Sequence, residues 1–145
     1  MITPRRIVVS VLLAGAIALL LYSFTLVRPT STPVVFKNAA VKAVSPTVGA
    51  LVLRETAVGI TLGPGYSLAS QVTDGLSIQS DGATTGIPQD QIQITPGQNL
   101  YTFLPSAGQA VAELPVGRVC VIAEIEQVSN PNAAPQQFSW CFQTQ

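Results

Sequence analysis

Apolar residues follow two different patterns along the chain. Residues 7–27 form a continuous apolar run that contains no charged side chain. Beyond residue 48, apolar and polar residues alternate with a period of two, in short segments separated by turn sequences such as Asp74-Gly75. The alternating segments are residues 58–62, 76–79, 91–95 and 100–103. The first pattern predicts a membrane helix, and the second predicts a domain of short β-strands.

The apolar run has the length of a membrane-spanning helix. A helix over residues 7–27 is about 31 Å long, close to the thickness of the hydrocarbon core of a bilayer. Arg5 and Arg6 precede the run, so the positive-inside tendency favours a cytoplasmic N-terminus at residues 1–6. We expect a single-pass protein of the cell membrane with its C-terminal part outside the cytoplasm. A cleaved signal peptide is the alternative, although the run is longer than a usual signal-peptide core.

Two segments follow the predicted membrane helix. Residues 28–43 open with a Pro- and Thr-rich sequence and are predicted to form a semi-extended stalk. Residues 44–145 hold the alternating segments and are long enough for one small hydrophobic core. Short strands with regular turn signals indicate an all-β fold, an antiparallel β-sandwich.

The last two predicted strands, residues 118–127 and 136–143, can be paired in register from the sequence. We pair them antiparallel so that opposed residue numbers sum to 261. Three apolar pairs then share one face: Val119 with Phe142, Val121 with Trp140, and Ala123 with Phe138. A shift by one residue would place the aromatic residues among polar ones. The core is therefore predicted to contain Val119, Val121, Phe138, Trp140 and Phe142.

The same register places Cys120 opposite Cys141 on the other face of these strands. Opposed residues in antiparallel strands lie about 4.5–5.5 Å apart at Cα, which is within the range for a disulfide. The chain has two cysteines, and disulfides persist in exported domains. We predict a structural disulfide. A redox-active pair is the alternative, with Arg118 as its basic neighbour.

Charge and composition narrow the range of functions. From residue 49 onward there are two basic and seven acidic residues, a net charge of −5, so the domain offers no basic surface for nucleic acid. The chain contains no histidine, which removes Ser-His and Cys-His catalysis and most zinc, copper and iron sites. We therefore expect no catalytic residue, no cofactor and no metal site.

Carboxylates supply the remaining candidate chemistry. Glu124 and Glu126 are two residues apart on a predicted strand and share a face, which could support acid–base work. More often such a pair is the solvent side of an outer strand, and we favour that interpretation. Asp74, Asp81 and Asp90 could gather around calcium, although the first two belong to turn dipeptides and the spacing matches no calcium loop.

Several short sequences occur in an order that resembles bacterial Ig-like domains of exported and cell-surface proteins. They are Ser45-Pro46-Thr47-Val48-Gly49, Val58-Gly59-Ile60-Thr61-Leu62, Phe103-Leu104-Pro105, Leu114-Pro115-Val116-Gly117 and Trp140-Cys141-Phe142. The resemblance covers about residues 43–145 and implies a β-sandwich with a scaffold or adhesion role. One branch of this broad group binds copper through His and Met ligands, which are absent beyond Met1 here, so that activity is not carried over.

The sequence thus predicts a membrane-anchored protein of the bacterial envelope with a non-catalytic, Ig-like interaction or structural domain outside the cytoplasm. Its expected partners are the membrane, through the N-terminal helix, and a protein or an envelope glycan, but not nucleic acid. Two alternatives stay open. One is a small-ligand or calcium-binding module on the loops, and the other is a glycan-cleaving enzyme that uses carboxylates alone.

Overall fold

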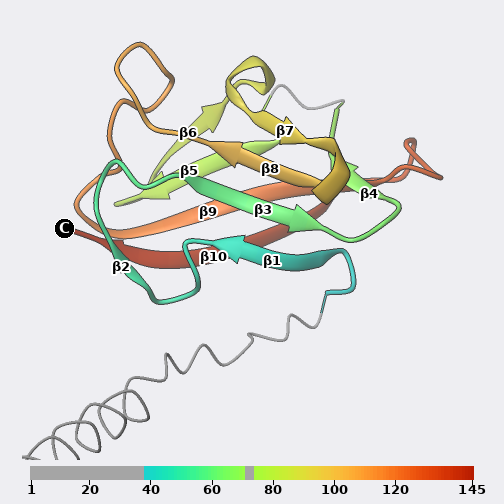
Figure 1. The fold of residues 1–145 in the computed structure, drawn as a ribbon, viewed down its shortest axis with the longest axis horizontal. Coiled ribbons are helices and arrows are strands. Elements are labelled where there is room, and N and C mark those ends of the chain that lie inside the picture. The colour runs from blue at the N-terminus through green and yellow to red at the C-terminus, as the bar shows by residue number, and fades with distance from the viewer. Residues whose placement is uncertain (1–37, 71–73) are drawn as a thin grey trace, which may run out of the picture. The chain divides into compact units, whose positions relative to one another are not determined.

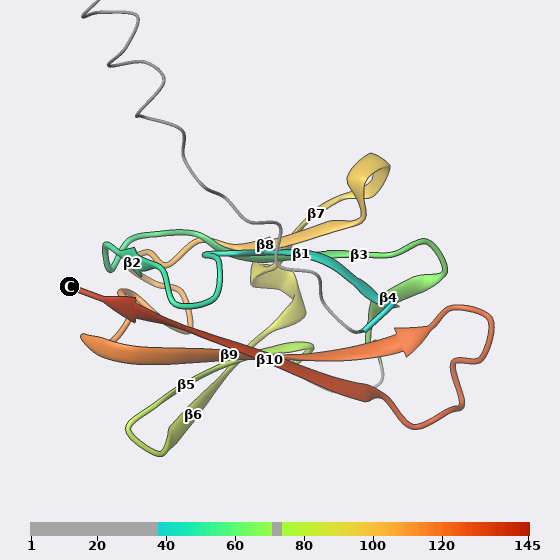
Figure 2. The same ribbon diagram turned by 90° about the horizontal axis from the view of Figure 1, so that it is seen from below.

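Two facing β-sheets form the domain in the computed structural model, which describes residues 38–70 and 74–145. Figures 1 and 2 show the two sheets as layers, with β1, β3, β8 and β7 in one layer and β9 and β10 in the other. The predicted cytoplasmic segment, the membrane helix at residues 7–27 and most of the stalk lie outside the described residues. Within the described ranges, no helix has the length and apolar character needed to span a membrane.

The first sheet has the strand order β1-β3-β8-β7, and all of its pairs are antiparallel. Its strands are β1 (Val41–Ser45), β3 (Val58–Leu62), β7 (Gln93–Thr95) and β8 (Leu100–Phe103). Two short 3-10 turns, η1 (Gln89–Gln91) and η2 (Pro96–Gln98), flank β7. The inner face of this sheet is apolar because Val58, Ile60 and Leu62 alternate with small or polar residues along β3.

The second sheet has the strand order β2-β10-β9-β5-β6. Its strands are β2 (Leu51–Val52), β5 (Leu76–Ser80), β6 (Ala83–Ile87), β9 (Gly117–Gln127) and β10 (Gln136–Thr144). A further strand, β4 (Tyr66–Leu68), pairs with the end of β9 on the same edge as β5. The pairing of β2 with β10 is parallel, which departs from the purely antiparallel sandwich that the sequence predicts.

The described part of the chain is therefore all-β, as predicted, but its first strand begins earlier than expected. Residues 41–43, assigned to the stalk from the sequence, belong to β1, and Ala40 and Val41 are buried. Strand β1 forms an edge of the first sheet by pairing with β3. Its exposed Lys42 and Ala43 interrupt the alternating pattern, which is why the sequence does not reveal it.

The predicted register of the last two strands is the register of the structure. Trp140 pairs with Val121, Phe142 with Val119, and Phe138 with Ala123. Val119, Val121, Trp140 and Phe142 are at most 2% exposed and lie in the core. Phe138 differs from the prediction, because it is only half-buried and packs against the edge of the core beside Trp140. It lies near the start of β10, two residues before Trp140.

The β5–β6 hairpin explains Asp81, one of the predicted calcium candidates. Ser80 pairs with Ala83, so Asp81 and Gly82 form a two-residue turn, and both have positive φ angles, 49° and 81°. This is the backbone geometry of a type I′ turn, for which Asp-Gly is a preferred sequence. The identity of Asp81 is thus accounted for by the turn.

Candidate functional site

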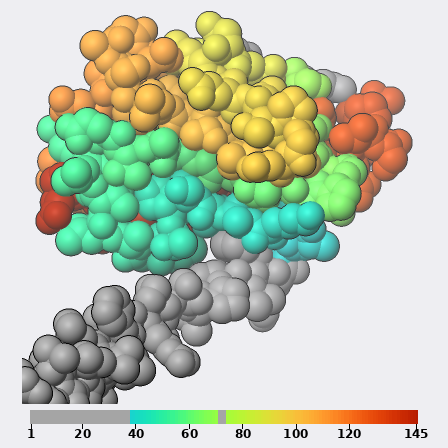
Figure 3. All heavy atoms as spheres, viewed as in Figure 1, coloured from blue at the N-terminus to red at the C-terminus, as the bar shows by residue number. Residues whose placement is uncertain are grey.

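A small cavity opens between the two sheets on the side closed by β4 and β7. Its volume is about 240 Å³. The residues that line it come from both sheets and from the connecting turns: Ser67, Leu68, Ser70, Gln89, Ile92, Ile94, Tyr101 and Glu126. Figure 3 shows the segment around η1, β7 and η2 (yellow) exposed on the surface of the domain. Apolar walls with a few polar groups are typical of a small-molecule site.

Glu126 is the charged residue of this cavity and is only 8% exposed. Ser70 Oγ donates a hydrogen bond to Glu126 Oε1 at 3.0 Å, and Ser67 Oγ donates to the same oxygen at 3.4 Å. Within residues 38–70 and 74–145, no basic side chain forms an ion pair with this carboxylate. A buried carboxylate without a cationic partner is costly unless other groups compensate it.

The position of Glu126 corrects the interpretation of Glu124 and Glu126 as a pair on the solvent side of an outer strand. Ile125 and Glu126 are both buried, so burial no longer alternates along β9 at its end. At this end the neighbouring strand is β4, whose Ser67 pairs directly with Glu126. Glu124 lies between β4 and β5, where its backbone bonds to Ala69 and Gly75, and it does not line the cavity.

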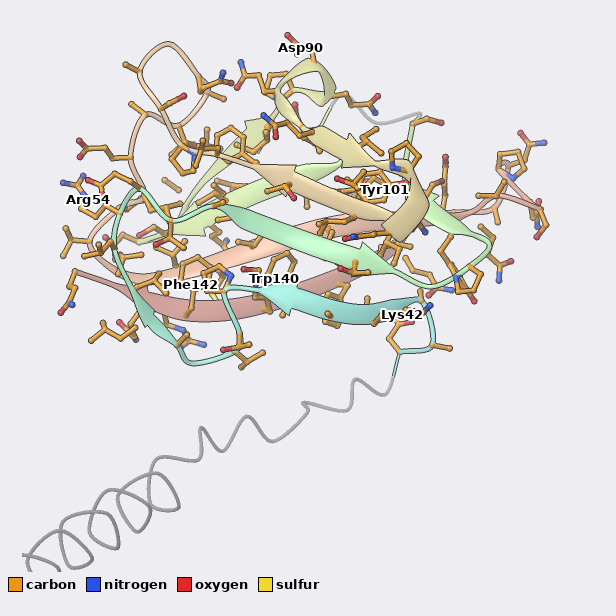
Figure 4. All side chains as sticks on the ribbon, in the orientation of Figure 1. Lys42, Arg54, Asp90, Tyr101, Trp140 and Phe142 are labelled. Carbon is orange, nitrogen blue, oxygen red and sulfur yellow. A yellow bond between two sulfur atoms is a disulfide. The ribbon has the colours of Figure 1, made fainter. Side chains whose placement is uncertain are left out.

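Tyr101 forms the aromatic wall of the cavity from β8, in the position labelled in Figure 4. Its hydroxyl group donates to Asn99 Oδ1 at 3.3 Å. Asn99 adopts a left-handed conformation, and its Nδ2 donates to the carbonyl oxygens of Gly63 and Tyr66, which fixes it in place. Burial raises the pKa of Tyr101, the nearby Glu126 carboxylate adds to this rise, and a hydrogen bond with the Leu68 backbone opposes it. The phenol therefore stays protonated and neutral at physiological pH.

The mouth of the cavity carries exposed residues from both sides. Ile94 on β7 is 58% exposed, while its neighbour Ile92 is buried. Gln89 Nε2 donates to the Ala69 carbonyl at 3.2 Å and so connects η1 to the end of β4. The cavity is thus open to ligands at Ile94 and Ser70, with the carboxylate at its inner side.

The predicted calcium candidates do not meet at one place. Asp74 packs against Gly86 of β6, Asp81 is in the β5–β6 turn, and Asp90 is an exposed residue of η1. Figure 4 shows Asp90 at the outer edge of the domain. Among the residues that the structure describes, no group of three His, Cys, Asp or Glu side chains could hold a metal ion.

The predicted disulfide between Cys120 and Cys141 is present. The two residues are directly opposed in β9 and β10, and their sulfur atoms are bonded at 2.05 Å. Both cysteines are half-buried on the face opposite to Val119 and Val121. Arg118 Nη2 lies 3.7 Å from Cys141 Sγ. Neither cysteine lines the Glu126 cavity. The bridge links the two longest strands, β9 and β10.

Comparisons with known proteins support the fold and no more. No protein-family model matches the chain, and no curated protein matches its sequence. Among solved structures, the chain is similar to PcoC, a methionine-rich copper resistance protein from Escherichia coli, with a TM-score of 0.50 and 11% identity over 72% of this chain and 96% of PcoC. It is also similar to the LD transpeptidase LdtMt1 in complex with imipenem, with a TM-score of 0.41 and 22% identity over 74% of this chain and 40% of that protein. The second similarity is too weak to carry an argument.

Proposed function

We propose that this chain is a membrane-anchored protein of the bacterial envelope whose Ig-like domain is a non-catalytic binding module outside the cytoplasm. The observation that carries the binding role is the cavity at Glu126. It combines apolar walls with one buried carboxylate, two serine hydroxyls and a tyrosine, which is the composition of a site that orients a ligand.

Two features support the location. The apolar run at residues 7–27 has the length and the flanking arginines of a single-pass anchor. The disulfide between Cys120 and Cys141 fits an oxidising compartment, since cytosolic thiols are kept reduced. The β-sandwich architecture agrees with the sequence resemblance to exported Ig-like domains.

Binding accounts for the cavity better than catalysis by a pair of carboxylates. Glycan cleavage by two acids needs both groups beside the same bond. Glu126 lines the cavity whereas Glu124 does not. The similarity to PcoC does not extend to a proposal of copper binding, because the chain has one methionine, Met1, and no histidine.

The topology of the chain tests the location. Protease added to intact cells should digest the domain that contains Gln145 and leave a membrane-embedded N-terminal fragment, because the arginines at residues 5 and 6 hold that end inside. The measurement is an immunoblot with separate tags at the two ends of the chain. A cytoplasmic protein in the same cells serves as the control and should stay intact. A C-terminal tag that survives until the membrane is permeabilised would contradict the proposed location.

A further inference from the structure

We infer that the Glu126 cavity binds an aliphatic ammonium group, with the Glu126 carboxylate as its counter-ion. This inference rests on the proposed binding role of the domain and names the chemistry of its ligand. The ligand enters past Ile94 and Ser70, places its charged nitrogen at Glu126, and lays its methylene groups along the apolar walls.

The charge of the cavity selects a monovalent cation. Glu126 is the one carboxylic acid among the lining residues, and no lining residue is basic. A single ammonium group balances its charge, whereas a divalent metal ion leaves one positive charge uncompensated and finds too few oxygen ligands. An anion is repelled. A neutral polyol leaves the buried carboxylate without a countercharge.

The hydrogen-bonding groups also fit an ammonium. Both serine hydroxyls donate to Glu126 Oε1, and among the described residues no hydrogen bond reaches the other carboxylate oxygen, Oε2. An ammonium group has three donors and no acceptor, so it can bond to Oε2 without disturbing the serines. A hydrogen bond between charged groups is stronger than one between neutral groups.

The walls and the size of the cavity define the rest of the ligand. Leu68, Ile92 and Ile94 supply aliphatic surface for a methylene chain, and the ring of Tyr101 lines the same space. Aromatic rings attract nearby cations through their quadrupole. At about 240 Å³ the cavity is smaller than a usual drug-sized pocket, so it suits a short amine or the end of a longer group. A free alkylamine and the lysine side chain of a partner protein share this chemistry.

Calorimetric titration of the full chain in uncharged detergent micelles tests the inference. The probe is n-butylammonium chloride, and n-butanol is its neutral counterpart of equal chain length. We expect saturable binding of butylammonium and at least about tenfold weaker binding of butanol, because the charge-assisted contact is lost. Glu126→Gln should weaken butylammonium binding by about tenfold or more for the same reason. Glu124→Gln, on the same strand but outside the cavity, should leave binding unchanged.

Each possible result decides the question. Absence of saturable butylammonium binding, equal binding of butanol, or unchanged binding by Glu126→Gln would overturn the inference, provided that the melting temperature of the variant shows it to be folded. If Glu126→Gln does not fold, the comparison of butylammonium with butanol on the unaltered chain decides the question, and binding of butanol within about tenfold of butylammonium would overturn the inference. Nα-acetyl-lysine amide, which keeps a free side-chain ammonium group, serves as the second probe. If it binds as tightly as butylammonium, the ligand is assigned to a partner's lysine side chain. If it binds more weakly, the ligand is assigned to a free amine. The proposed function is tested independently by the topology of the chain.

Discussion

Trp140→Ala is expected to lower the free energy of unfolding by about 3–5 kcal/mol, the usual cost of removing a large buried aromatic side chain. Trp140 is 2% exposed, lies opposite Val121 on the inner face of the second sheet, and has its ring centre 6.1 Å from that of Phe138. Because Trp140 belongs to the buried core cluster, removing its ring leaves a large cavity. Chemical denaturation followed by circular dichroism measures the effect.

Two further variants serve as controls for this prediction. In the described part of the chain, the indole Nε1 of Trp140 has no hydrogen-bond partner, so Trp140→Phe removes an unsatisfied polar group and keeps an aromatic ring. It should cost much less than Trp140→Ala. Glu124→Gln, at a half-buried position outside the core, should change stability by less than about 0.5 kcal/mol. Equal losses for Trp140→Ala and Glu124→Gln would mean that the inner and outer faces of β9 and β10 are wrongly assigned.

Removal of the disulfide is expected to lower the free energy of unfolding by roughly 3 kcal/mol. Cys120 and Cys141 are 21 residues apart, and closing a loop of this size restricts the unfolded chain by about that amount. The double variant Cys120→Ser/Cys141→Ser should therefore melt at a lower temperature than the unreduced protein. Because neither cysteine lines the Glu126 cavity, butylammonium binding by the folded variant should be unchanged.

Alkylation of protein taken from cells separates a structural bridge from a redox-active pair. Unreduced protein should gain no alkyl groups, and reduced, denatured protein should gain two, as measured by mass spectrometry. Two modified thiols before reduction would show that the bridge is absent in the cell. This result would also remove the support that the disulfide gives to an exported domain.

The sequence predicts the strands in which apolar and polar residues alternate regularly, and in two of them the pairing of the cysteines agrees with that alternation. The register of β9 and β10 follows from placing Trp140 and Phe142 inside, and it independently places Cys120 opposite Cys141. The limits of β3 and β8 are also correct, because apolar residues alternate regularly there and turns bound both segments.

Other strands escape prediction because their partners define them. β6 is mostly exposed, and β2 and β4 are two and three residues long, so none of them shows a clear apolar pattern. β2 and β4 pair with β10 and β9, which are distant from them in sequence. β6 pairs with its neighbour β5, but its exposed residues give no apolar pattern of their own.

The Glu126 cavity could not be predicted from the sequence for a related reason. Ser67 and Ser70, which bond to Glu126, precede it by 59 and 56 residues. Alternation along β9 places Glu126 outside with Glu124, and only the unpredicted pairing of β4 brings the serines to its carboxylate. A charged residue next to a buried Ile125 at the end of a long strand is too common a pattern to indicate a site.

Photo-crosslinking in cells that make the protein naturally tests most directly whether the Glu126 cavity is where the domain binds. A photoreactive amino acid replaces Ile94 at the mouth of the cavity or, as a control, the exposed Thr84 on β6, which does not line it. The proposed function predicts a discrete adduct from position 94 that is lost with Glu126→Gln, retained with Glu124→Gln, and absent from position 84. Absence of an adduct at position 94, or an adduct there that survives Glu126→Gln in folded protein, would contradict it.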